Sequence, residues 1–134
     1  MAQTTKSIIC DGSGDYVAYG TGFPDCDGTL SLSMWALLDS IGSNQALVWD
    51  TLTGQFAIRV TGSGNIDWFQ GAGPGAASFS LGVFPLSAAT WYHLLFVRTG
   101  SAGSWGIKCY VNGVQASDSP GSISADPAAS PTSF

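Results

Sequence analysis

The sequence predicts an all-β fold, an antiparallel β-sandwich of the jelly-roll kind. About ten short runs of strand-forming residues recur at regular spacing between turn signals, a pattern typical of sandwiches. No stretch shows a 3.6-residue apolar repeat over a helical length, although residues 34–41 come closest. All nine acidic residues are Asp, which favours turns, and none is Glu, which favours helices. These three observations agree on a chain built of strands.

The predicted strands follow one another along the chain. The first two are "KSIIC", which ends at an Asp-Gly turn, and "DYVAY". The third, "TLSLSMWAL", places alternate apolar residues from Leu30 to Met34 on one face and Trp35 on the other. The later strands are "ALVWDT", "QFAIRV", "NIDWF", "ASFSL", "WYHLLFVRT", "WGIKCYV" and "VQAS".

The last two strands meet at Asn112-Gly113, within "CYVNGVQAS". A two-residue turn that matches strand twist needs positive φ at both central positions, which Asn tolerates and Gly adopts freely. The pair therefore predicts a tight hairpin. In the strand before it, alternation places four residues on one face: Trp105, Ile107, Cys109 and Val111.

The segment after the hairpin, "SPGSISADPAASPTSF", is rich in Pro, Ser and Ala and cannot form a central strand. We therefore expect a sandwich domain over residues 1–118 and an extended arm over residues 119–134. The candidate partner-binding residues of this arm are Pro120, Pro127, Pro131 and Phe134.

Composition limits the partners. The chain of 134 residues suggests one domain; 45% of its residues are hydrophobic, 10% are charged, and its net charge is −5. Four basic residues cannot neutralise a run of phosphates, so nucleic-acid binding is not expected. The N-terminus has no apolar run of signal-peptide length and no transmembrane run occurs, so we expect synthesis in a cytoplasm and no membrane partner.

The three cysteines, Cys10, Cys26 and Cys109, are an odd number and form no CxxC motif or Cys/His cluster. Zinc binding is therefore not expected. Free thiols in a reducing compartment are the simplest account, and one disulfide remains an alternative.

Several motifs together resemble the laminin-G-like, concanavalin A-like lectin/glucanase superfamily, over residues 8–117. The motifs are Asp11-Gly12 before Tyr16-Val17, Trp35 in an alternating strand, Trp91 and His93 before the Gly-rich turn 100–103, and the run from Tyr110 to Gly113. The resemblance implies a concanavalin-like jelly roll. Members of this family continue past the hairpin into closing strands. No such strand is recognised in this chain, so we expect a shortened sandwich with an open edge, or one that a neighbouring chain completes.

The resemblance also bears on catalysis. Glucanases of this superfamily carry paired Glu residues on one strand, and glycoside hydrolysis usually needs two placed carboxyl groups. This chain has no Glu, and no close Asp pair falls within a predicted strand. His93, the one histidine, has no evident catalytic partner, and we expect a structural residue within the sandwich. We expect no enzymatic activity and no cofactor.

Some relatives bind calcium through Asp and carbonyl oxygens in loops. If this chain did so, the candidates would be Asp11, Asp15, Asp25 and Asp27. Clustered Asp in Gly-rich turns is more typical of turn chemistry, so we expect no metal.

The aromatic residues are the best ligand candidates, because sugars stack on exposed indole and phenyl rings. The candidates are Trp35, Trp49, Trp68 and Phe69. Burial in the core or at an oligomer contact is the alternative for each of them. For Trp91 and Trp105 we expect packing.

Two functions remain. The first is a structural virion protein of a bacteriophage, a capsid decoration (cement) or tail-associated protein located in the virion. It would bind other virion or capsid subunits and form a homo-oligomer or symmetric assembly. Low charge, the missing closing strand and the Pro-rich arm favour it. The alternative is a free-standing carbohydrate-binding module, which the family resemblance and the spare Trp residues favour.

Overall fold

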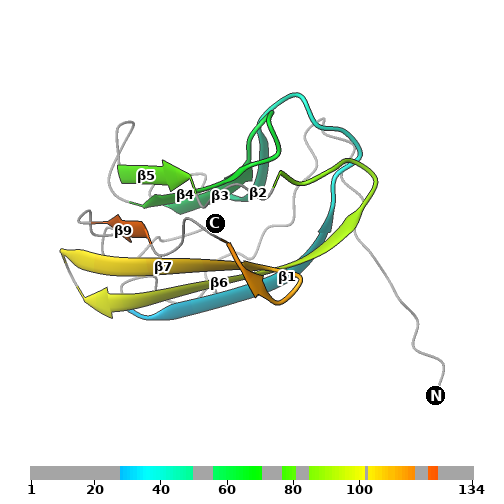
Figure 1. Ribbon diagram of the computed structural model, residues 1–134. Helices are drawn as coiled ribbons and strands as arrows, with labels where there is room; N and C mark the ends of the chain where they lie inside the picture. Colours follow the sequence, from blue (N-terminus) through cyan, green and yellow to red (C-terminus); the bar gives the residue numbers. More distant parts are fainter. Residues whose placement is uncertain are drawn as a thin grey trace, which may run out of the picture.

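Two antiparallel β-sheets face each other in the computed structural model of the chain (Figure 1). The structure describes residues 28–49, 56–70, 77–80, 85–101, 103–116 and 121–123. Within these ranges every regular element is a strand, and no helix is long and apolar enough to span a membrane. The predicted β-sandwich is confirmed.

The first sheet, called here the β1–β6–β7 sheet, has the strand order β1-β6-β7-β8, with β9 also paired to β7. Its strands are β1 (Leu30–Leu37), β6 (Trp91–Ser101), β7 (Ser104–Val111), β8 (Val114–Gln115) and β9 (Gly121–Ile123). The second sheet, the β2–β5 sheet, has the order β2-β3-β4-β5. Its strands are β2 (Gln45–Trp49), β3 (Phe56–Val60), β4 (Ile66–Gln70) and β5 (Ala77–Ser80).

β1 to β8 match the predicted strands from "TLSLSMWAL" to "VQAS". The first two predicted strands, "KSIIC" and "DYVAY", lie outside the described residues. Period-two alternation sorts the side chains of β4 and β7 as expected, with every second residue buried between the sheets. The resulting core contains Leu38, Ile58, Val60, Ile66, Trp68, Leu86, Leu94, Phe96, Trp105, Ile107, Cys109, Val111 and Ala116.

The hairpin between β7 and β8 turns at Asn112 and Gly113, with φ of 50° and 81°. Both values are positive, as the sequence predicts for a tight turn that follows strand twist. The Asn112 side chain also takes part, because its Oδ1 accepts a hydrogen bond from the backbone N–H of His93 at 2.9 Å. The turn residue therefore fixes the start of β6 as well as the hairpin.

β9 corrects the expectation that no strand follows the hairpin. Gly121–Ile123 pairs with β7 opposite Trp105 to Ile107, and the Ala116 N–H donates to the Cys109 carbonyl at 2.9 Å. This edge of β7 is thus covered near both of its ends. The physical reason is that a three-residue run without Pro can pair at a sheet edge even when prolines flank it.

The other residues of the predicted arm, including Pro120, Pro127, Pro131 and Phe134, lie outside the described residues. The domain boundary at residue 118 and the partner-binding role of the arm stay predictions.

A buried arginine joins the two sheets. Arg98 on β6 is fully buried, and its Nη1 donates to Gln70 Oε1 on β4 at 3.1 Å. Its Nε donates to the Gly28 carbonyl at 3.1 Å, and the guanidinium lies 4.6 Å from the ring centre of Trp105. Trp68 Nε1 donates to the same Gln70 oxygen at 3.3 Å. Hydrogen bonds and a cation–π contact therefore offset part of the cost of burying this charge.

We expect Arg98→Ala to lower the free energy of unfolding by about 3 kcal/mol or more, because it removes core hydrogen bonds and leaves a cavity. Urea unfolding measures the change. Arg59→Ala is the matched control: its side chain is 32% exposed and pairs with Asp67 at 2.9 Å, so its loss should cost under about 1 kcal/mol. Equal losses in the two variants would contradict a bridging role for Arg98.

A second prediction concerns Cys109, whose side chain is fully buried in the core. Burial raises the pKa of the Cys109 thiol from 9.0 to about 12, because the core disfavours the thiolate. In a Cys10→Ser/Cys26→Ser variant, we expect Ellman's reagent to react with Cys109 at pH 8 only after unfolding in urea.

The same shift fixes the sign of the pH dependence. Well below pH 9.0 the thiol is protonated in both the folded and the unfolded protein, so its full contribution to the stability of the folded state is present. As the pH rises toward 12, the unfolded state loses its proton first and stability falls. Cys109→Ala should lack this alkaline loss. Fast labelling of the native thiol at pH 8 would contradict its burial.

Candidate binding surface on β1 and β6

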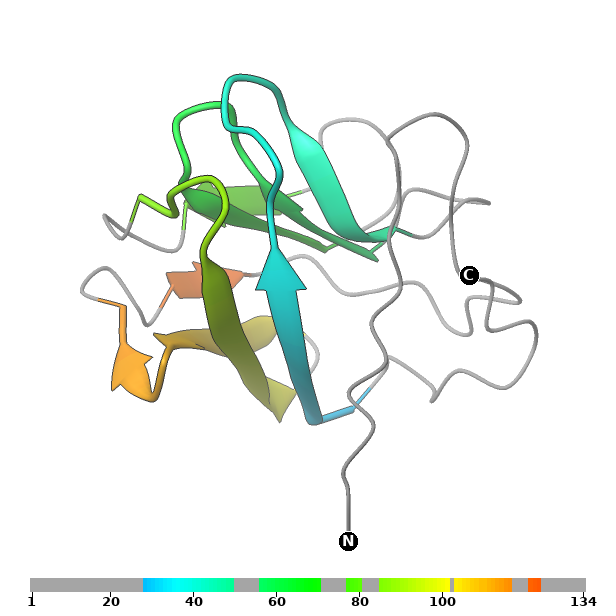
Figure 2. The ribbon, with the colours of Figure 1, turned by 90° about the vertical axis from the view of Figure 1, so that its right-hand side faces the viewer.

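Exposed apolar side chains gather on the outer face of the β1–β6–β7 sheet. Trp35 is 67% exposed, Trp91 50% and Leu37 42%. The register of β1 and β6 pairs Trp35 with His93 and Leu37 with Trp91. Directly opposed residues of an antiparallel pair share a face, so these four side chains lie together. Figure 2 shows the two strands side by side.

Polar groups lie beside the indole of Trp35. His93 Nε2 and Ser33 Oγ are 2.8 Å apart and form a hydrogen bond. The imidazole and the Trp35 ring lie 5.3 Å apart between centroids, tilted by 49°. We call Ser33, Trp35, Leu37, Trp91 and His93 the aromatic strip. It combines flat apolar rings with a hydroxyl and an imidazole that can form hydrogen bonds.

The position of His93 corrects a prediction. We expected a structural histidine within the sandwich, but its side chain is half-buried on the outer face and contacts Ser33 and Trp35. The alternation of β6 explains this, because Leu94, whose side chain is fully buried, is its neighbour and faces the core. Because every second residue of β6 from Leu94 to Arg98 is buried in the core, His93 lies on the outer face.

The four predicted ligand residues do not form one site. Trp35 belongs to the aromatic strip. Trp68 is fully buried, with its ring centre 6.0 Å from that of Phe96, so burial holds for it and it offers no surface to a ligand. Phe69 is half-buried on the β2–β5 sheet, where the Arg59 guanidinium lies 4.4 Å from its ring centre.

For Trp49 the structure gives a register position opposite Ala57, and its side chain lies outside the description. Trp105 is buried as expected. Trp91 is not, and the expectation of packing was wrong for it. The even spacing from His93 in "WYHLLFVRT" assigns both residues to one face, but it does not tell which face of the strand is the outer one.

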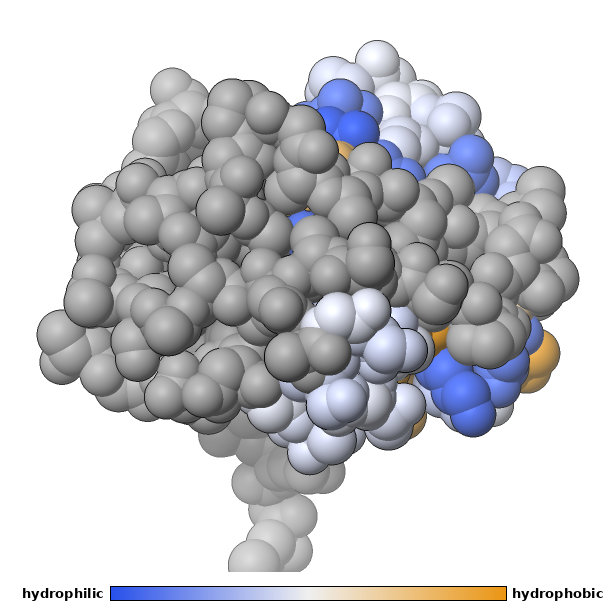
Figure 3. All heavy atoms as spheres, turned by 90° about the vertical axis from the view of Figure 1, so that its left-hand side faces the viewer, coloured by the Kyte–Doolittle hydropathy of each residue, from blue (hydrophilic) through white to orange (hydrophobic). Residues whose placement is uncertain are grey.

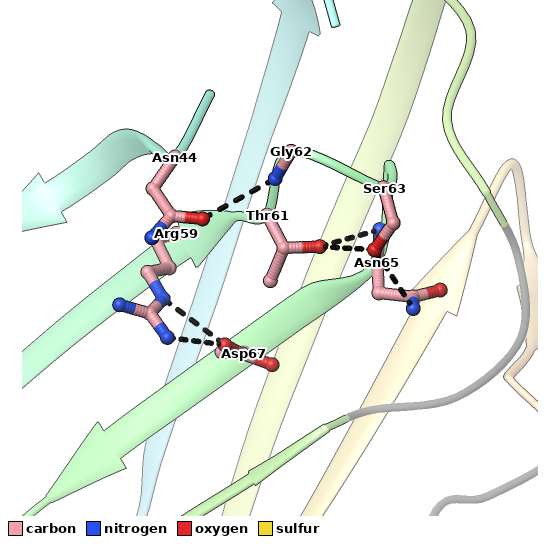
Figure 4. Close-up of polar contacts among 7 residues, drawn as sticks. All are labelled: Asn44, Arg59, Thr61, Gly62, Ser63, Asn65 and Asp67. Atoms are coloured by element: carbon pink, nitrogen blue, oxygen red, sulfur yellow. Dashed lines mark hydrogen bonds and ion pairs between the residues drawn. The ribbon is translucent and has the colours of Figure 1, made fainter. Parts of the chain in front are cut away.

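A second polar cluster lies at the β3–β4 hairpin (Figure 4). Arg59 Nε and Nη2 both donate to Asp67 Oδ2, at 3.0 and 2.9 Å. Within the turn 61–65 the hydroxyl and amide groups bond to one another, and the Gly62 N–H donates to Asn44 Oδ1 at 3.2 Å. The polar groups of the cluster bond to one another. The cluster therefore stabilises the β3–β4 hairpin and its contact with Asn44, the residue just before β2.

The described carboxylates are not brought together. Asp39 is exposed just after β1, and Asp67 is held by Arg59 on the other sheet. In the described part of the chain, no group of three or more His, Cys, Asp or Glu side chains could hold a metal ion. The calcium candidates Asp11, Asp15, Asp25 and Asp27 lie outside it.

Apolar exposure is local. On the face drawn in Figure 3, the described residues are mostly hydrophilic or of intermediate hydropathy, with hydrophobic atoms in small areas. Beyond the aromatic strip, Val114 on β8 is the other large apolar side chain that is exposed among the described residues, at 58%. The strip is thus the place where large exposed apolar side chains lie together in the described part of the chain.

The comparisons with known proteins agree with the fold. The model of the family described as "Concanavalin A-like lectin/glucanases superfamily" matches residues 11–134, nearly the whole chain. Neither a curated protein nor a solved structure gave a match. The match therefore bears on family and fold, and the superfamily includes both lectins and glucanases.

The exposure of the tryptophans predicts how a collisional quencher acts on them. We expect acrylamide to quench less of the fluorescence in Trp35→Phe and in Trp91→Phe, because each variant removes an accessible indole. Trp68→Phe, the matched control, should remove an inaccessible indole and raise the quenchable fraction. A lower quenchable fraction in Trp68→Phe would contradict the assigned faces.

Proposed function

The chain belongs to the concanavalin A-like lectin/glucanase superfamily, and from this premise we propose that it is a non-catalytic carbohydrate-binding or adhesion domain. The observation that supports this most is the indole of Trp35, 67% exposed beside the hydrogen-bonded pair His93 and Ser33. A sugar ring has an apolar face of C–H groups and a rim of hydroxyls. The indole suits the face, and the imidazole and hydroxyl suit the rim.

A binding role is favoured over hydrolysis by the residues present. The sequence holds no Glu, and the described Asp residues lie apart: Asp39 follows β1, and Asp67 on β4 is paired with Arg59. Hydrolysis of a glycosidic bond usually requires a pair of carboxyl groups, one on each side of the bond. Our proposal therefore assigns the domain recognition without bond cleavage.

A second candidate is the structural role in a bacteriophage virion, as a capsid decoration or tail-associated protein. The observation that favours it is a flat apolar strip on a protein with only 10% charged residues. Such a surface also suits subunit contacts in a symmetric assembly. In that case the partners would be other virion subunits and the location would be the virion.

A glycan array followed by titration tests the first candidate. We expect a defined sugar preference, and a loss of affinity of about tenfold or more in Trp35→Ala, because one stacking surface is removed. Val114→Ala is the matched control, since it also truncates an exposed apolar residue of the same sheet but lies outside the strip.

Light scattering of the purified protein completes the test. A monomer that binds sugar through Trp35 supports the carbohydrate role. A protein that ignores every sugar and assembles into polymers or binds particles contradicts it and favours the virion role.

A further inference from the structure

The aromatic strip holds two exposed indoles at neighbouring register positions. Trp35 on β1 lies opposite His93 of β6. Trp91 precedes His93 by two residues and lies on the same face of β6. Trp91 is therefore the diagonal neighbour of Trp35. Such diagonal positions lie about 7–8 Å apart, and two residues along a strand span about 7 Å. Two indoles at this spacing extend farther than one six-membered ring.

The groups between and beside the indoles are polar or apolar side chains. His93 lies next to Trp35 and is bonded to Ser33, and Leu37 faces Trp91. None of the five strip residues is an acid, a lysine or an arginine. A ligand that covers the strip is therefore matched in charge when it is neutral.

The described cations lie elsewhere. Arg98 is buried between the sheets, and Arg59 lies on the β2–β5 sheet, paired with Asp67. Lys108 is exposed on the outer face of β7, but its register partner is Val97, four residues from His93 along β6. Among the described residues, no lysine or arginine lies on the strip to bind the anionic group of a sulfated, phosphorylated or carboxylated sugar.

We propose that the strip binds a linear, neutral oligosaccharide of at least two rings, with one ring stacked on Trp35 and the next on Trp91. This rests on the proposed function and adds a second subsite to it. His93 and Ser33 lie where they can bond hydroxyls of the ring on Trp35. Because the two indoles are diagonal neighbours, the chain of sugars crosses obliquely from β1 to β6 and need not be bound by its end.

Stacking on two rigid platforms explains why a chain is a better ligand than one sugar. Both indoles project from paired strands, so little conformational freedom is lost when a ligand binds. The second ring then adds its contact without the full entropy cost of a separate binding event. A monosaccharide can occupy only one of the two subsites.

The test is a calorimetric titration with linear gluco-, manno-, galacto- and xylo-oligosaccharides of one to six units. For the series that the protein prefers, we expect affinity to rise about tenfold or more from the monosaccharide to the short oligomers. Trp91→Ala should remove this gain, so that the short oligomers bind no more tightly than the monosaccharide does. Trp35→Ala should weaken every member of the series.

Two control variants show whether the effect depends on the aromatic ring at position 91. Trp91→Phe retains an aromatic ring and should restore most of the gain, whereas Val114→Ala should behave as the original protein. Urea unfolding of each variant shows whether the fold is retained. The length dependence of the unaltered protein needs no variant, so a poorly folding Trp91→Ala does not decide the outcome.

The outcomes separate the two proposals. Equal affinity for monosaccharide and oligomer, or a length gain that survives Trp91→Ala in a folded protein, overturns the second subsite and leaves the carbohydrate role intact. A preference for anionic sugars also overturns it. If no sugar binds and the strip instead contacts a protein subunit, both proposals fail.

Discussion

The buried guanidinium of Arg98 is the interaction on which the arrangement of the two sheets depends. It extends from β6 across the interior to Gln70 on β4, and Trp105 lies beside it. A guanidinium in a sandwich core is tolerated only when acceptors are placed around its N–H groups, and here the oxygens of Gly28 and Gln70 accept while the Trp105 ring makes a cation–π contact. This requirement ties β6 of one sheet to β4 of the other through Arg98 and Gln70.

The same strand that carries the buried arginine also carries part of the proposed binding face. Because side chains alternate, burial of Leu94, Phe96 and Arg98 places His93 on the opposite face, where Trp35 meets it from β1. The core therefore positions the aromatic strip. A site on hydrogen-bonded strands is held more rigidly than one on loops, which suits stacking, where small displacements of a ring weaken the contact.

Much of this architecture could be predicted from the sequence, because alternation and turn chemistry are local signals. The strands from β1 to β8 and the faces of β7 follow from period two, and the hairpin follows from Asn112-Gly113. What could not be predicted depends on contacts between distant segments. Nothing local marks the three residues of β9 as a strand, since they form it only because the edge of β7 is available.

The site was harder to predict for a related reason. General preferences place Trp inside and Arg outside, whereas Trp91 is exposed and Arg98 is buried. Their places follow from the phase of β6, and that phase is fixed by the opposite sheet. Trp35 was assigned correctly to the face opposite Leu30, Leu32 and Met34, but its register partner His93 lies on β6, a strand far away in the chain.

The central claim is that a neutral sugar chain lies on the outer face of β1 and β6. Its most direct test is an NMR titration of the indole N–H signals with the oligosaccharide that binds best. The account predicts that the signals of Trp35 and Trp91 shift together and saturate at one ligand concentration, while those of Trp68 and Trp105 stay in place. Shifts confined to other indoles, or no shift at saturating sugar, would contradict it.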